Sequence, residues 1–317
     1  MQDSITMQGS SMKPASLGCG SLSRVGNTPL LRFDSLAPQP DVQILGKAEW
    51  ANPGGSVKDR AAFNIVETAL RSAELSKGKR LLDATSGNTG IAYAMIGAAR
   101  GIPVTLCVPE NVSIERKRIL AAYGAEILWT DPLEGTDGAI RKAQALYAAE
   151  PKKYFYADQY SNDANWLAHF HGTANEIWSQ TEGKITHFVA GLGTSGTFMG
   201  TTRRLKELNP AIRAISLQPD SAFHGLEGLK HMATALVPKI YDPSLADEAL
   251  EISTETAYEM VKRMARSEGV LMGISSGGAL AAAERVARRA GQSAVVVTVL
   301  PDSADRYLSE HFWSDSP

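Results

Sequence analysis

The sequence NPGGSVKDRAA (residues 52–62) connects a predicted strand to a predicted helix. The strand is the mainly apolar run VQILGKAEW (42–50). The helix begins at Ser56, because a serine followed three residues later by an acidic residue, here Asp59, is typical of a helix N-terminus. An apolar stripe with helical spacing follows, formed by Ala62, Ile65, Val66, Ala69 and Leu70. We therefore expect a strand, a glycine-rich turn and an amphipathic helix in this order.

The same strand–turn–helix unit recurs along the rest of the chain. Further strand candidates are RLLDAT (80–85), PVTLCVP (103–109), AEILWT (125–130), YFYAD (154–158), ITHFVAGLG (185–193), RAISLQP (213–219) and AVVVTVLP (294–301). Helical patterns lie at 89–100, after Ser113, at 136–149, 163–180, 197–208 and 254–267, and after Ser276. This alternation predicts an α/β fold with mostly parallel, helix-covered sheets. Ligands of such sheets bind at the carboxyl ends of the strands.

Length and composition narrow the class of protein further. A chain of 317 residues predicts two domains at about 150 residues each, and because no linker separates two halves, we expect the domains to be intertwined. Lys plus Arg number 32 and Asp plus Glu 34, so the net charge is −2, which argues against a partner such as nucleic acid or an anionic membrane. No apolar run reaches the ~18 residues of a membrane span, and no Cys/His cluster has metal-ligand spacing. The polar N-terminal segment, 1–21, resembles a flexible tail rather than a signal peptide, so we expect a cytoplasmic protein.

Two of the predicted turns carry polar groups suited to chemistry. Lys58 lies in the first turn of its helix, where the helix dipole disfavours a cation. It is therefore either a Schiff-base nucleophile or a solvated surface lysine. The turn TSGNTG (85–90) offers backbone N–H groups and hydroxyls suited to a carboxylate, and it is equally typical of a capped helix start.

Two later turns are rich in glycine and serine. GLGTSGT (191–197) follows a strand and opens a helix, and it matches a loose GxGxxG pattern. No acidic residue of the dinucleotide-binding unit follows about twenty residues later, so the hydroxyl-rich loop favours a single phosphate monoester. In GISSGG (273–278), the paired serines taken alone are typical of helix caps.

Together and in this order, the four turns resemble those of the fold-type II pyridoxal phosphate enzymes, most closely the cysteine synthase (O-acetylserine sulfhydrylase) family. The resemblance extends over residues 22–310 and includes VGNTPLL (25–31), VPENVSIER (108–116) and YDP (241–243). It implies a fold like that of the tryptophan synthase β subunit, with two intertwined domains. The small, mobile domain would comprise residues 48–160, and the large one 22–47 and 161–317.

The resemblance also assigns roles to residues of the four turns. Lys58 corresponds to the catalytic lysine that carries pyridoxal 5′-phosphate as an imine. The other residues that match cofactor-binding positions are Asn88, Gly193, Thr194, Ser195, Gly196, Thr197 and Ser275. Those that match the subsite for the substrate α-carboxylate are Thr85, Ser86, Gly87, Thr89 and Gln159.

The implied activity is a β-replacement that makes L-cysteine from an O-activated L-serine and sulfide through an α-aminoacrylate intermediate, in a homodimeric transferase. O-acetylserine is the first expectation for the activated serine, because the segment 220–232 lacks an arginine that would favour O-phosphoserine. Lys230, His224 and His231 either substitute for this arginine or are simply exposed. Gln218-Pro219 also departs from the usual Glu-Pro of the family. The alternatives are use of O-phosphoserine or thiosulfate, a cystathionine β-synthase or serine/threonine dehydratase relative, and a catalytically silent binding protein.

Overall fold

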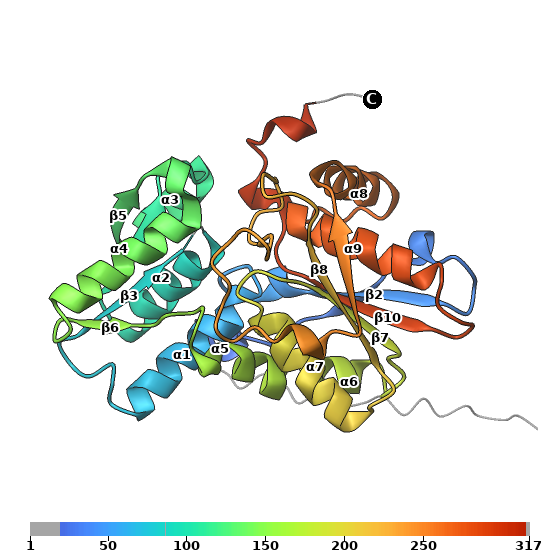
Figure 1. The fold of residues 1–317 in the computed structure, drawn as a ribbon, viewed down its shortest axis with the longest axis horizontal. Helices are drawn as coiled ribbons and strands as arrows, with labels where there is room; N and C mark the ends of the chain where they lie inside the picture. Colours follow the sequence, from blue (N-terminus) through green and yellow to red (C-terminus); the bar gives the residue numbers. More distant parts are fainter. Residues whose placement is uncertain (1–19, 86, 315–317) are drawn as a thin grey trace, which may run out of the picture.

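The computed structural model of the chain describes residues 20–85 and 87–314. Two sheets lie side by side, a six-stranded sheet and a four-stranded sheet, each with helices on both faces (Figure 1). The strands are β1 (Leu30–Arg32), β2 (Gln43–Ala48), β3 (Arg80–Ala84), β4 (Val104–Pro109), β5 (Glu126–Thr130), β6 (Tyr154–Tyr156), β7 (His187–Gly191), β8 (Arg213–Pro219), β9 (Glu248–Ile252) and β10 (Val295–Leu300). The α/β fold class expected from the sequence is therefore confirmed.

The helices are interleaved with these strands. They are α1 (Lys58–Arg71), α2 (Asn88–Arg100), α3 (Ile114–Ala122), α4 (Gly135–Ala149), α5 (Asp163–Ala168), α6 (Ala174–Gln180), α7 (Gly196–Leu208), α8 (Thr254–Ser267) and α9 (Ile274–Ala287).

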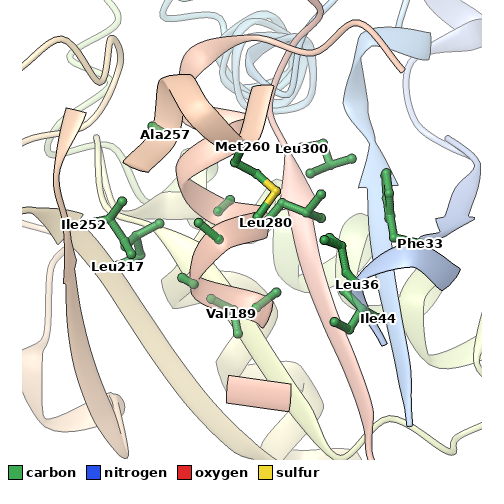
Figure 2. Packing of buried hydrophobic residues seen from close by; sticks show 14 of the residues in the cluster. Phe33, Leu36, Ile44, Val189, Leu217, Ile252, Ala257, Met260, Leu280 and Leu300 are labelled. Carbon is green, nitrogen blue, oxygen red and sulfur yellow. The ribbon is translucent and has the colours of Figure 1, made fainter. Parts of the chain in front are cut away.

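The larger sheet has the strand order β1-β2-β10-β7-β8-β9. Its strands pair in parallel except for the short β1, which runs antiparallel to β2. Helices α8 and α9 cover one face and α6 and α7 the other (Figure 1). Figure 2 shows part of the core under α9, where Leu280 and Met260 pack with Val189, Leu217 and Leu300 from the strands. β10 is apolar except for Thr298 and is buried along its whole length, as a central parallel strand requires.

The smaller sheet, in the order β5-β4-β3-β6, is entirely parallel. Successive side chains of its central strands point to opposite faces. Leu81 and Leu106 pack with the cluster of α1 and α2, whereas Leu82 and Cys107 pack with α4. All strands of this sheet lie within the predicted small domain, and the division into a mobile and a fixed domain stays a prediction.

The structure corrects several predicted boundaries. Helix α1 begins at Lys58 with Val57 as its N-cap, so Ser56 is not the cap residue. The helix expected over 163–180 is interrupted by a π-helical turn, His169–Thr173. Ser275 and Ser276 lie inside α9, whose N-cap is Gly273, so they are not caps.

Two strands were not predicted from the sequence, and one predicted segment lies outside the described residues. β1 and β9 were not expected at all. Of the expected N-terminal tail, residues 1–19 lie outside the described part of the chain. In residues 20–85 and 87–314, no helix is long and apolar enough to cross a membrane.

Candidate active site

A cavity of about 600 Å³ lies where the carboxyl ends of strands from both sheets meet. The segments that follow β3, β6, β7 and β10 all contribute to its wall, as expected for α/β sheets. The predicted site residues that line it are Lys58, Thr85, Asn88, Thr89, Gln159, Gly193, Thr194, Ser195, Thr197 and Ser275. Gly87 and Gly196 lie in the same turns without lining the cavity, and Ser86 lies outside the described residues.

Lys58 is the first residue of α1 and lines the cavity. Burial lowers the pKa of its ammonium group, and the nearby carboxylate of Asp302 opposes this shift. A lysine in this environment is more readily available as a neutral amine than an exposed lysine is. The solvated surface lysine that the sequence left open is therefore not what the structure shows.

Asn88 is held between two charged residues that follow β10. Its Nδ2 donates to Asp302 Oδ2 at 2.6 Å, and its Oδ1 accepts from the guanidinium of Arg306. Asp302 is wholly buried and also accepts from the hydroxyl of Tyr307 at 2.6 Å. These contacts fix the orientation of the Asn88 amide at the cavity wall.

Asp302, Arg306 and Tyr307 were not identified from the sequence. The segment after the strand at 294–301 carries no motif, and its contact with Asn88 joins residues 214 positions apart. The one available signal was their position, because charged residues directly after the carboxyl end of a buried parallel strand face the binding edge of the sheet.

The turn between β7 and α7 forms a tight cradle in which two glycines leave no space for a side chain. A Cβ at Gly193 would overlap the carbonyl oxygen of Gly228, and one at Gly196 would overlap the side chain of Asn165. Ser195, at φ +68°, is the N-cap of the 13-residue helix α7, and its buried Oγ has no hydrogen-bond partner in the described part of the chain. The free hydroxyl and the helix N-terminus suit a phosphate group.

Two threonines of the same turn are positioned by buried side chains. Thr194 Oγ1 accepts from Asn165 Nδ2 at 3.0 Å, and Thr197 Oγ1 lies 3.3 Å from His169 Nε2. Burial keeps the pKa of His169 well below its ordinary value, so this imidazole is neutral at pH 7. The cradle is therefore ordered by neutral groups behind it, which leaves its surface to the ligand.

The structure brings the TSGNTG turn and Gln159 together across the smaller sheet. Thr85 Oγ1 accepts from the backbone N–H groups of Gly87 and Gly90 at 3.0 and 3.1 Å. Thr89 Oγ1 donates to Gln159 Oε1 at 2.8 Å, and Gln159 Nε2 donates to the carbonyl oxygen of Ala84 at 2.7 Å. Gln159 thus supports the turn from behind as well as lining the cavity.

The two serines of α9 are placed differently. Ser275 lines the cavity and is 4% exposed. Ser276 is fully buried and donates to the carbonyl oxygen of Asp302 at 3.0 Å. Only Ser275 is therefore available to a ligand in the cavity.

Comparison with known proteins identifies the family. The model of the pyridoxal-phosphate-dependent enzymes matches residues 22–302. A cysteine synthase of Aquifex aeolicus is 51% identical over 93% of this chain and 92% of its own length. The chain belongs to the cysteine synthase family. Cysteine synthase B of Escherichia coli is 41% identical over 91% of this chain and 96% of its own.

Solved structures that are similar to this chain support the same fold. The crystal structure of a cysteine synthase from Entamoeba histolytica has a TM-score of 0.89 at 33% identity and covers all of this chain and 95% of its own. An O-ureido-L-serine synthase has a TM-score of 0.87 at 34% identity, covering 94% of this chain and 95% of its own. The predicted family, its fold and its enzymatic nature are thereby confirmed.

Pyridoxal phosphate, the cofactor predicted from the sequence, is the cofactor of the cysteine synthase family, and the residues of this chain fit it. The cradle at 193–197 suits its phosphate. Lys58 offers an amine of lowered pKa to its aldehyde, and Asn88 and Ser275 line the wall between these groups. These groups together suit a ligand that combines a small aromatic aldehyde with one phosphate.

Proposed function

We propose that this chain makes L-cysteine from O-acetyl-L-serine and sulfide, with Lys58 as the catalytic residue. The observation that carries the proposal is one cavity that places the Lys58 amine, the phosphate cradle and the TSGNTG turn around a shared space. Bound pyridoxal phosphate supplies an electron sink that lets an amino acid lose its α-proton and its β-substituent. The residues of the chain hold the cofactor and substrate and move the proton.

In this proposal, Lys58 Nζ takes the proton from the α-carbon and later returns it. The lowered pKa of Lys58 supports this role, because a base works only when it is not already protonated. Gly193, Thr194, Ser195, Gly196 and Thr197 hold the phosphate, and Asn88 and Ser275 hold the ring. The TSGNTG turn binds the α-carboxylate of the substrate.

The charges of the segment 220–232 support an acetyl rather than a phosphate leaving group. Lys230 Nζ lies 2.9 Å from Asp137 Oδ1 and over the ring of Tyr160, so its charge is already balanced. His231 Nδ1 bonds to Thr234 Oγ1 at 2.9 Å, and burial lowers the pKa of His224. The segment 220–232 therefore presents no unbalanced cation to a phosphate dianion.

Steady-state kinetics of the holoenzyme test this choice. We expect kcat/KM with sulfide to be at least about tenfold higher for O-acetylserine than for O-phosphoserine or serine, because the segment 220–232 offers a phosphate group no unbalanced cation. Thiosulfate in place of sulfide tests the second substrate. A preference for O-phosphoserine would refute the acetyl proposal and favour the alternative substrate.

We further propose a homodimer, as the resemblance implied, and a cytoplasmic location, as the polar N-terminal segment predicted. Light scattering coupled to size-exclusion chromatography measures the mass directly. A mass equal to the 33.9 kDa of one chain would refute the dimer.

Replacement of Ser275 should change which reaction dominates. Ser275→Ala should reduce activity only modestly, because a serine hydroxyl does not force the ring nitrogen to stay protonated. Ser275→Asp should promote side reactions such as transamination. The keto acid that keeps the β-substituent measures transamination, and pyruvate measures elimination without sulfide addition, each per cysteine formed. Ser276→Ala is the matched control, since Ser276 bonds to the backbone of Asp302 instead of lining the cavity. Unchanged reaction specificity in the Asp variant would argue against the assignment of Ser275.

Replacement of Gln159 should slow elimination without altering the resting enzyme. Gln159→Ala removes the partner of the Thr89 hydroxyl, so the TSGNTG turn loses support where the carboxylate binds. We expect about a tenfold lower rate of β-elimination, as for the loss of one or two hydrogen bonds, with an unchanged resting absorbance spectrum. Rapid-mixing absorbance after addition of O-acetylserine measures the rate. Elimination at the wild-type rate would contradict this role of Gln159.

A further inference from the structure

Arg116, the last residue of the VPENVSIER motif, is a buried cation that the proposed function does not yet use. It is only 3% exposed, and together with Leu120 it accounts for the buried residues of α3. Its side chain lines the same cavity as Lys58 and the TSGNTG turn. A buried guanidinium requires anionic or hydrogen-bonding partners, so its surroundings indicate what it binds.

The partners of Arg116 leave part of its guanidinium free. Nη1 pairs with Glu227, a residue of the β8–β9 connection whose side chain is 37% exposed. The guanidinium also lies 5.0 Å from the ring centre of Tyr307. Its Nε is buried and has no hydrogen-bond partner in the described part of the chain. An unpaired N–H of a charged group is costly to bury unless a ligand completes it.

The free Nε lies against the turn proposed to bind the α-carboxylate. A Cβ at Gly87 would be only 2.8 Å from Arg116 Nε and 3.0 Å from Cζ. The glycine thus allows the guanidinium to approach the N-terminus of α2, where the helix dipole also favours an anion. The partly exposed carboxylate of Glu227 would compete with a bound anion for the guanidinium of Arg116.

Among the described residues of this subsite, the side chains of Thr85, Thr89 and Gln159 are neutral and already engaged. Thr85 Oγ1 accepts two backbone bonds, and the Gln159 amide is paired with Thr89 and Ala84. A carboxylate moved from water into the cavity loses hydration that neutral donors only partly replace. A guanidinium beside the turn would supply the missing charge.

We propose that Arg116 is a substrate-binding residue whose guanidinium pairs with the α-carboxylate of the amino-acid substrate, with Glu227 as the exposed counter-ion that yields to it. The proposal rests on the proposed function, because it assumes that the substrate carboxylate binds at the TSGNTG turn. It holds for any leaving group, since O-acetylserine, O-phosphoserine and serine share the α-carboxylate.

The test compares L-serine with L-serinamide, in which a neutral amide replaces the carboxylate. Binding to the holoenzyme is followed by the change in cofactor absorbance. Arg116→Gln should weaken L-serine binding by about tenfold or more, as expected for one charge-assisted hydrogen bond, and serinamide binding by less than about twofold. Arg116→Lys should restore part of the preference for the carboxylate.

Glu227→Gln separates a binding role from a structural one. If Glu227 only competes for Arg116, its removal should strengthen L-serine binding by roughly twofold to fivefold. If the ion pair is merely structural, both variants should weaken binding of both ligands. Lys206→Gln breaks the pair with Asp247, which lies outside the cavity, and should leave the serine-to-serinamide ratio unchanged.

Two outcomes would overturn the proposal while sparing the proposed function. One is that Arg116→Gln weakens the binding of L-serine and L-serinamide equally. The other is that, in the same absorbance titration, it weakens only the binding of O-phosphoserine, which would place the guanidinium at the leaving group. If the wild-type holoenzyme gave no absorbance change with L-serine and no turnover with O-acetylserine, the proposed function itself would fail.

Discussion

Lys58→Ala should abolish cysteine synthesis and the covalent attachment of pyridoxal phosphate. The amine of Lys58 is the group proposed both to hold the cofactor and to move the α-proton, so its loss removes two functions at once. We expect kcat to fall by at least about 10³-fold. Borohydride reduction followed by mass spectrometry of the intact chain should show the added mass of the cofactor in the wild type and not in the variant.

Two further variants make this result specific. Lys58→Arg retains a positive charge beside Asp302 but lacks the nucleophilic amine, so it should be as inactive as the alanine variant. Lys77→Ala removes an exposed lysine outside the cavity and should behave like the wild type. Full activity of Lys58→Ala, or covalent cofactor in that variant, would refute the assignment of the catalytic lysine.

The fold was predictable from the sequence where local patterns determine it. The strand 213–219 and the helix 254–267 have the predicted bounds, because each is a regular pattern bounded by turn residues or a cap. β9 was missed because Glu248 and Glu251 make the segment look polar. It is an edge strand that buries only Leu250 and Ile252, so long apolar runs do not reveal it.

The site was predictable only where its residues lie in recognisable turns. Lys58, Asn88, Gly193 and Ser275 come from four separate motifs, and the structure places all four at one cavity. The contacts behind them are long-range and leave no local pattern. The pairing of Asn88 with Asp302 and the approach of Arg116 to Gly87 depend on the packing of elements far apart in the chain.

Gly193→Ala should weaken pyridoxal phosphate binding more than any other single substitution in the cradle. The new Cβ would overlap the carbonyl oxygen of Gly228, which is backbone and cannot rotate away as a side chain would. The loop must therefore shift, and with it the backbone N–H groups and the Ser195 hydroxyl that we propose to hold the phosphate. Overpacking of this kind costs about 1–3 kcal/mol, so we expect cofactor affinity to fall by about 5- to 150-fold.

A cofactor without its phosphate shows whether the cradle is responsible. Titration of the apoprotein with pyridoxal phosphate should show the full loss in Gly193→Ala, whereas titration with pyridoxal should show little change. Gly291→Ala is the matched control, because its Cβ would meet open space and its φ lies outside the left-handed region. Equal losses for the two ligands would mean that the substitution disturbs the whole cavity. Unchanged affinity for both would mean that the phosphate binds elsewhere, and in either case the assignment of residues 193–197 as its cradle would fail.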